Sequence, residues 1–127
     1  MDLEERAARI LLAIHQSMNW SIWGSKRLKY WTVYTDNVRS AAYTNSLVKF
    51  VNNLCSRMDV AVLGKNKAHR AQIEELLNNI TAEEEKQLLR LFREQATTLV
   101  LQVRVWIEEK RAEYEIAEEE ETDGLPV

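Results

Sequence analysis

The chain has 127 residues, of which 46% are hydrophobic, and its formal net charge is −3 at pH 7. This length is that of a single domain, and no apolar run approaches the roughly 20 residues that a membrane-spanning helix needs. Three glycines and one proline leave few special turns, and the lone Cys55 excludes an internal disulfide or a cysteine metal cluster. The acidic start of the chain is unlike a signal peptide, so we expect a cytoplasmic protein that does not contact a membrane.

The first predicted helix runs from about Leu3 to Trp23. Apolar residues recur in it at steps of three and four and form one face, namely Leu3, Ala7, Ile10, Leu11, Ile14 and Met18. Glu4 and Glu5 suit its first turn, where the helix dipole favours acidic side chains. Gly24 is a typical helix stop.

Residues 26–62 are harder to assign. The sequence of residues 30–34 has the propensity of a strand, but no second strand candidate exists to pair with it. We therefore expect a long helix, broken near Thr35 and Asp36. Its second part carries an apolar arc of Leu47, Val48, Val51, Leu54, Cys55 and Met58. Arg39, Lys49 and Arg57 fall away from that arc and could form a basic ridge.

Two further helices are predicted after Gly64. The first covers about residues 67–80, with Ile73, Leu76, Leu77 and Ile80 facing inward. Thr81 and Glu84 then form a capping box, which opens a long helix reaching about Ala117. Its core arc holds Leu88, Leu89, Phe92, Ala96, Leu99, Val100, Val103, Trp106 and Ile107. The sequence thus predicts an all-α fold, a bundle of four to five helices with one long C-terminal helix. The bundle is expected to form a single domain of residues 1–117. An acidic, disordered tail of residues 118–127 is expected to follow it.

The charge of the chain is strongly polarised. Residues 20–70 contain nine basic and two acidic residues, a balance of +7, and seven of the ten aromatic residues. Cations attract phosphates and flat rings stack on bases, so this segment is a candidate nucleic-acid surface. The candidate contacts are Lys26, Arg27, Lys29, Arg39, Lys49, Arg57, Lys65, Lys67 and Arg70, with Trp23, Tyr30, Trp31 or Tyr34 against bases or sugars.

Two alternatives stay open for this segment. The rings could belong to the core or to an interface while the cations are merely solvated. The cations could instead pair with the acidic stretch 108–121, either folded back or from a neighbouring subunit.

The last predicted helix carries two more patterns. Arg90, Thr97, Arg104 and Arg111 are seven residues apart and line one face over about 31 Å, with Arg93 beside them, which is a possible second basic face. Glu94, Glu108 and Glu115 each follow one of these arginines by four residues, so helix-stabilising ion pairs explain the same pattern. A second apolar stripe is a candidate interface with a protein partner and consists of Leu91, Leu101, Val105 and Ile116.

No catalytic pattern is present. His15 and His69 have no partner at metal-ligand spacing, and Ser-His-Asp, P-loop, GxGxxG and CxxC arrangements are missing from the sequence. His15 is expected to be a structural histidine, and Cys55 a buried small hydrophobe. We therefore expect neither an enzyme, nor a metal site, nor a cofactor.

The basic-aromatic segment, the arginine stripe and the second apolar stripe together resemble the small helical subunit of CRISPR (Cascade-like) effector complexes. This resemblance covers residues 3–117 as architecture. It implies a non-catalytic small subunit of a nucleoprotein assembly in antiviral defense, with copies placed along a crRNA-guided complex. Apolar stripes would contact other protein subunits, and basic surfaces would stabilise guide–target duplex or the displaced DNA strand without reading sequence. The alternative is a helical protein-interaction adaptor or homodimer whose basic segment docks an acidic protein partner.

Overall fold

The computed structural model describes residues 2–18, 28–58 and 67–123; for residues 18, 67–70 and 115–123 it gives the backbone alone. These parts of the chain form helices and no strand, as predicted. The helices are α1 (Leu3–Met18), α2 (Leu28–Ala41), α3 (Leu47–Arg57), α4 (Lys67–Leu77), α5 (Ala82–Glu94) and α6 (Ala96–Asp123). The described parts hold six helices where four to five were expected, because a break falls inside each of the two longest predicted helices. The predicted stop at Gly24 lies outside the described residues.

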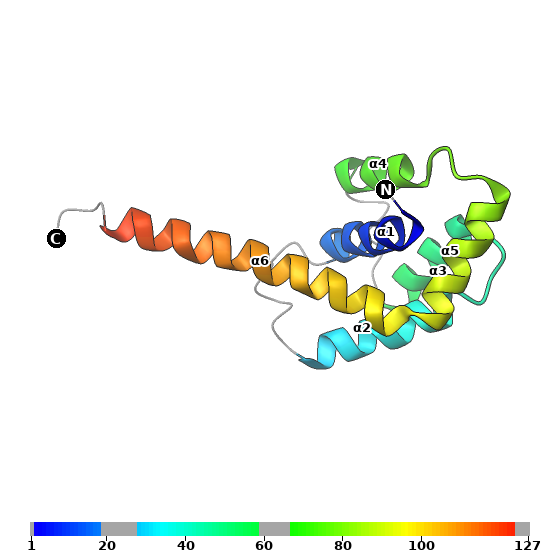
Figure 1. Ribbon diagram of the computed structural model, residues 1–127, viewed down its shortest axis with the longest axis horizontal. Helices are drawn as coiled ribbons and strands as arrows, with labels where there is room; N and C mark the ends of the chain where they lie inside the picture. Colours follow the sequence, from blue (N-terminus) through cyan, green and yellow to red (C-terminus); the bar gives the residue numbers. More distant parts are fainter. Residues whose placement is uncertain (1, 19–27, 59–66, 124–127) are drawn as a thin grey trace.

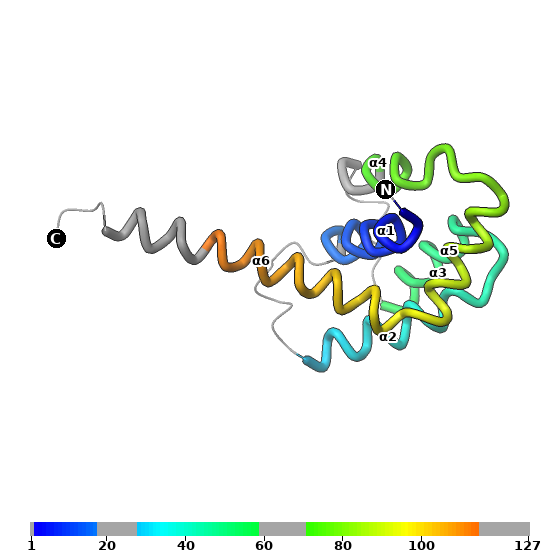
Figure 2. Tube along the Cα trace, viewed as in Figure 1, coloured from blue at the N-terminus to red at the C-terminus, as the bar shows by residue number. Residues whose placement is uncertain are grey.

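The helices pack around α1, which contacts α4, α5 and α6 (Figure 1). Helix α2 lies along α6 and also contacts α3 and α5. Figure 2 shows the path of the backbone through this bundle and along α6, which runs out of it. None of the helices in the described ranges is long and apolar enough to cross a membrane.

The core consists mainly of the apolar arcs that the sequence predicted. Ala7, Ile10, Leu11 and Ile14 of α1 are buried, and so are most members of the predicted arcs on α3, α5 and α6. The prediction that Val48 belongs to the core arc of α3 is wrong, because 62% of its surface is exposed. Phe50 is buried instead and stacks on Phe92, with 4.2 Å between the ring centroids.

The break between α2 and α3 lies at residues 42–46, so the break predicted near Thr35 and Asp36 is wrong. Thr35 donates a hydrogen bond to the carbonyl of Trp31 one turn earlier, which is compatible with a continuous helix. Helix α3 begins instead behind Ser46, whose hydroxyl accepts from the backbone N–H of Lys49.

The capping box of Thr81 and Glu84 is confirmed, with both of its hydrogen bonds 3.1 Å long. The single helix predicted after it is wrong, because the chain bends at Gln95, where φ is −123° and ψ is 27°. Helix α6 then continues past residue 117 to Asp123, so the predicted disordered tail is helical over residues 118–123. The bend divides the arginine stripe between two helices.

Candidate interaction surface

The aromatic residues of α2 belong to the core. Trp31 is 4% exposed and Tyr34 is fully buried, with its hydroxyl donating to the carbonyl oxygen of Leu11 at 2.7 Å. The expectation that these two rings lie against nucleic-acid bases is therefore wrong. Trp31, Tyr34, Val38 and Ala41 follow each other at helical spacing, which was the signal for a buried face.

His15 completes this aromatic cluster. Its Nδ1 lies 2.6 Å from the hydroxyl oxygen of Tyr30, and its ring centroid lies 5.0 Å from that of Trp31. Burial lowers the pKa of His15 to about 4, so the ring is neutral at pH 7. Burial also raises the pKa of Tyr30, whose hydroxyl stays protonated. The expected role of His15 as a structural histidine is confirmed.

The predicted nucleic-acid contacts are only partly within the described chain. Trp23, Lys26, Arg27 and Lys65 lie outside the described residues, and Lys67 and Arg70 are described by the backbone of α4 alone. Lys29 on α2 and both Lys49 and Arg57 on α3 are exposed. The expected ridge of Arg39, Lys49 and Arg57 is wrong as a helical face, because these residues lie on two separate helices.

The arginines of the predicted second basic face bind protein groups. The Nε of Arg90 lies 3.2 Å from a carboxylate oxygen of Glu94, and that of Arg104 lies 3.1 Å from one of Glu108. Arg93 donates to the carbonyl oxygen of Ala42 at 3.1 Å. Arg111 is half-buried on α6. The pairing of arginine with glutamate four residues later, considered as an alternative, thus accounts for two members of the stripe.

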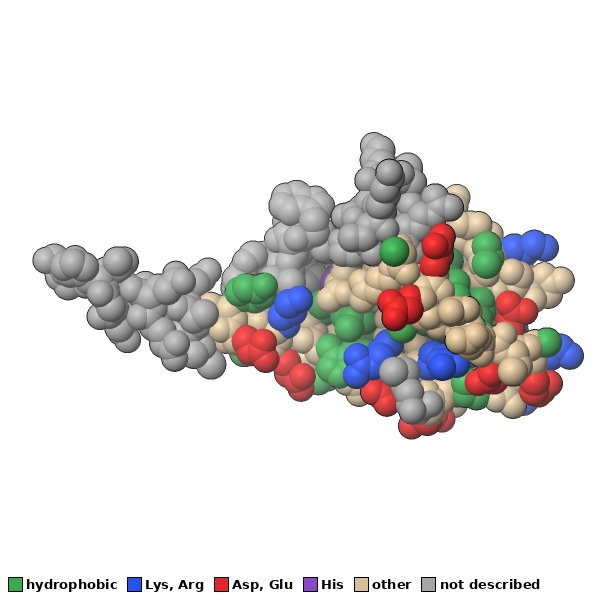
Figure 3. Space-filling model, turned by 90° about the horizontal axis from the view of Figure 1, so that it is seen from above, with side chains coloured by type: hydrophobic (Ala, Val, Ile, Leu, Met, Phe, Trp, Pro, Cys, Tyr) green, Lys and Arg blue, Asp and Glu red, His purple; other side chains and the backbone are tan. Residues whose placement is uncertain are grey.

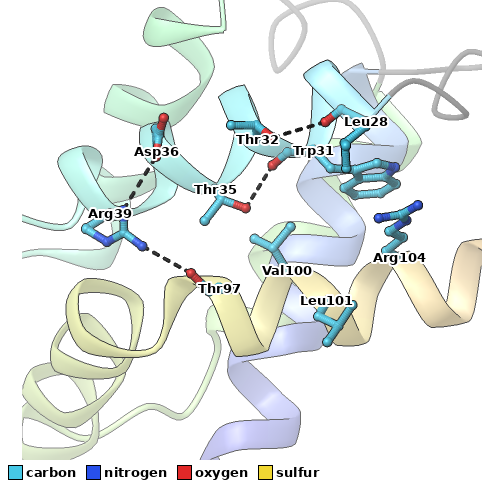
Figure 4. Close-up of a pocket in the computed structure, with 10 residues that line it drawn as sticks. All are labelled: Leu28, Trp31, Thr32, Thr35, Asp36, Arg39, Thr97, Val100, Leu101 and Arg104. Atoms are coloured by element: carbon cyan, nitrogen blue, oxygen red, sulfur yellow. Dashed lines mark hydrogen bonds and ion pairs between the residues drawn. The ribbon is translucent and has the colours of Figure 1, made fainter.

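A groove of about 340 Å³ runs between α2 and α6 (Figure 4). Its apolar walls include two side chains that solvent reaches freely, Leu28 at 65% exposure and Leu101 at 56%. Its full lining is Leu28, Trp31, Thr32, Thr35, Asp36, Arg39, Thr97, Val100, Leu101 and Arg104. The sequence analysis missed Leu28, although it is an apolar residue one turn outside the aromatic cluster of α2.

The polar groups of this groove are already bonded within the protein. The hydroxyls of Thr32 and Thr35 donate to backbone carbonyls of α2. Arg39 closes one end, with a nitrogen 3.2 Å from the hydroxyl of Thr97 and another 3.5 Å from the carboxylate of Asp36. Arg104 lies beside Trp31 at the other end (Figure 4). The groove therefore offers apolar surface with a guanidinium at each end.

A second hollow, of about 400 Å³, lies on the other side of α6, against α1. Asp2, Glu4 and Glu5 line it on the α1 side, and Leu101, Val105 and Trp106 on the α6 side. Leu101 thus borders both hollows, and Val105 beside it is 40% exposed. The bundle face in Figure 3 mixes hydrophobic, acidic and basic side chains.

The members of the predicted partner stripe differ in exposure. Leu101 and Val105 are exposed on α6. Leu91 lies on α5, half-buried against the core, so its assignment to the stripe is wrong. Ile116 lies in the part of α6 for which the structure gives the backbone alone. We name the exposed surface around Leu101 and Val105 the outer face of α6.

No group of His, Cys, Asp and Glu side chains suited to a metal ion occurs in the described ranges. Cys55 is buried, as predicted, and burial raises the pKa of its thiol. Comparison with known proteins finds no matching family model, curated protein or solved structure.

Proposed function

We propose that this chain is a non-catalytic binding subunit that docks on another protein through the outer face of α6 and the groove beside α2. The observation that carries the proposal is the exposure of Leu28, Leu101 and Val105 together at one place on the surface. Scattered apolar side chains are normal on a surface. Here, however, Leu28 and Leu101 line one groove, and Leu101 and Val105 line the next.

The composition of this surface fits a protein partner. Contact surfaces combine an apolar centre with a polar and charged rim. Leu101 lies at the centre here, while Arg39 and Arg104 border the α2 side and Glu4 and Glu5 the α1 side. Burying an exposed leucine contributes roughly 1.5–3 kcal/mol, so two or three such residues can anchor a complex.

Affinity capture from cells that contain the protein tests this function. The bait is the whole chain, compared with Leu101→Asp and with Val48→Asp as matched control. Val48 is 62% exposed on α3 and lies outside both hollows, so its substitution changes charge and apolar surface without touching the proposed site. We expect one or more proteins to be captured by the wild type and by Val48→Asp but not by Leu101→Asp. Equal capture by all three baits would contradict the proposal.

A nucleic-acid contact is the second candidate, as the resemblance to the CRISPR small subunit implies. It is favoured by the exposure of Lys29, Lys49 and Arg57 and by the balance of +7 in residues 20–70. Within the described parts of the chain, no ion pair occupies Lys29 or Arg57. These cations would contact phosphates in a sequence-independent way.

Fluorescence anisotropy with labelled single-stranded and duplex DNA and RNA, at two or more salt concentrations, tests this candidate. Removing one phosphate-binding cation lowers the slope of log K against log salt by about 0.7–0.9, so Lys29→Ala, Lys49→Ala and Arg57→Ala together should lower it by roughly two units or more. Lys86→Ala with Lys110→Ala serves as control, because both lysines are exposed outside the basic segment. Absence of binding at low salt would remove the nucleic-acid role and leave the protein-binding function in place.

A further inference from the structure

The hollow between α1 and α6 combines an apolar floor with an acidic wall. Ala8 and Leu99 line it and are buried, while Leu101 and Val105 expose their side chains on its α6 side. Three carboxylates line it from the start of α1, and no lysine or arginine of the described chain does. We name this depression of about 400 Å³ the α1–α6 hollow.

The α1 wall of this hollow keeps an excess of negative charge. Asp2 caps α1, with a carboxylate oxygen 2.7 Å from the backbone nitrogen of Glu5. The carboxylate of Glu5 pairs with Arg9, whose guanidinium lies over the ring of Trp106, 5.2 Å from its centroid. Glu4 is exposed, and no hydrogen bond or ion pair engages its carboxylate within the described residues. One guanidinium therefore stands beside three carboxylates.

The acidic surface continues along α6 beyond the hollow. Glu109 and Glu113 are both exposed. At 100° per residue they fall within the arc of about 80° between Thr98 and Trp106, which line the hollow. In the part of the chain that the structure describes, no hydrogen bond or ion pair engages either carboxylate. Carboxylates from two helices therefore border one apolar depression.

The stability of α6 does not explain these two glutamates. Glu109 and Glu113 are four residues apart, and like charges at this spacing destabilise a helix. Both lie inside α6, whereas the helix dipole acts on charges in the first and last turns. Arg104 and Arg111 lie on the opposite side of the helix at 100° per residue. A cation supplied from outside the chain would relieve the repulsion.

We propose that the α1–α6 hollow binds a basic amphipathic segment of another protein. The inference rests on the proposed function, because it names the chemistry of the partner that the outer face of α6 binds. An amphipathic helix binds such a groove through its apolar face. Its aliphatic side chains cover Leu101 and Val105. Its lysines or arginines then meet Glu4 on one side and Glu109 and Glu113 along α6.

The apolar and the charged parts of this surface have different roles. Removal of Leu101 and Val105 from water supplies affinity. The carboxylates select the partner, because complementary charge speeds association and like charge excludes acidic segments. The same carboxylates repel the phosphates of a nucleic acid. This surface is thus distinct from the basic segment of residues 20–70.

Fluorescence anisotropy of a labelled peptide with the purified full chain tests the proposal. The probe is a peptide of leucine and lysine with all leucines on one helical face, about 14 residues or four turns long. A comparison peptide has glutamate in place of each lysine. We expect the lysine peptide to bind, with an affinity that falls as salt is added, and the glutamate peptide not to bind. Equal binding of the two peptides, or no binding of the lysine peptide, would overturn the proposal.

Neutral variants locate the binding on the chain. Asp2→Asn with Glu4→Gln removes two charges while asparagine keeps the cap of α1, and Glu109→Gln with Glu113→Gln removes two from α6. Each pair should weaken binding of the lysine peptide about fivefold. The matched control is Glu75→Gln with Glu83→Gln, which makes the same charge change at two exposed positions outside the hollow and should leave the affinity unchanged. Equal weakening by all three pairs would show attraction to the net charge alone and overturn the proposal.

The apolar contact has its own pair of variants. Val105→Asn places a neutral polar group in the hollow and should weaken the lysine peptide several-fold, while Val48→Asn makes the same change on α3 and should not. Circular dichroism shows whether each variant keeps its helices. Sedimentation equilibrium of the chain without peptide tests the other occupant. Self-association that Asp2→Asn with Glu4→Gln abolishes would assign the hollow to a second copy and overturn the proposal.

These results also separate the inference from the function on which it rests. If the lysine peptide binds independently of the hollow but Leu101→Asp still abolishes capture of a protein, the basic character of the partner is wrong and the proposed function stands. If neither peptide binding nor capture depends on the hollow or on Leu101, both are wrong.

Discussion

Stability of the fold in acid should depend on His15. This side chain is buried against Tyr30, Trp31 and Tyr34, and no acidic group among the described residues pairs with it. Burial lowers its pKa from 6.5 to about 4, so the folded protein keeps the ring neutral at pH values where the unfolded chain protonates it. The stabilisation is fully present above pH 6.5 and is lost as the pH falls from there toward 4.

The magnitude follows from the two pKa values. Each unit of pKa difference corresponds to about 1.4 kcal/mol, so the free energy of unfolding should fall by about 2 kcal/mol between pH 7.5 and pH 5 through this residue alone. The carboxylate of Glu84 has its pKa lowered by hydrogen bonds to Thr81, which moves it further below this window. Comparison with a variant that lacks His15 separates the contribution of this histidine from that of other groups.

Urea unfolding followed by circular dichroism at several pH values measures this effect. His15→Gln keeps a polar group at the position but cannot titrate, so its free energy of unfolding should be nearly independent of pH across the window. His69→Gln removes the only other histidine and leaves His15 in place, so it should keep the wild-type dependence. An equally steep loss of stability in His15→Gln and in the wild type would refute the reasoning.

Three other substitutions test the fold and the assignment of the aromatic cluster, all by urea unfolding at pH 7. Phe92→Ala removes a fully buried ring that stacks on Phe50 and should lower the free energy of unfolding by about 3–5 kcal/mol. Val48→Ala on the surface should lower it by less than about 0.5 kcal/mol. Similar losses in the two variants would mean that the core is placed wrongly. Thr81→Ala removes the cap of α5 and should lower the free energy of unfolding by about 1 kcal/mol. Thr98→Ala, at an exposed position within α6, should change this free energy far less. A Thr81→Ala variant as stable as the wild type would contradict the capping box. Tyr34→Phe removes the hydrogen bond to Leu11 and should cost about 1 kcal/mol without changing any nucleic-acid affinity; a loss of affinity with unchanged stability would restore the base-stacking role.

The sequence predicted the helices best where the local pattern of apolar and capping residues matches the side chains that the fold buries or caps. The steps of three and four on α1 identify its buried face correctly, and the Thr81–Glu84 capping box marks the start of α5. The bend at Gln95 has no such signal, since neither glycine nor proline stands there and apolar periodicity continues on both sides. That break depends on tertiary packing, which single-sequence patterns do not report.

The candidate site shows the same limit. The aromatic residues at helical spacing in α2 could be either a stacking platform or a core face, and only their packing on α1 decides for the core. Leu101 and Val105 were recognisable because they fall off the core arc of α6. Leu28 lines the groove because α2 packs against α6, and this contact joins two segments that are far apart in the sequence. The sequence pattern does not report that contact.

Site-specific photo-crosslinking tests the central claim most directly. A photoreactive amino acid replaces Leu101 in one chain and Val48 in another, and both are irradiated in cells that contain the protein. The account predicts crosslinks from position 101 to a protein chain, either a second copy or another subunit, and far fewer from position 48. Equal crosslinking at the two positions, or none at position 101, would contradict a protein-binding role for the outer face of α6.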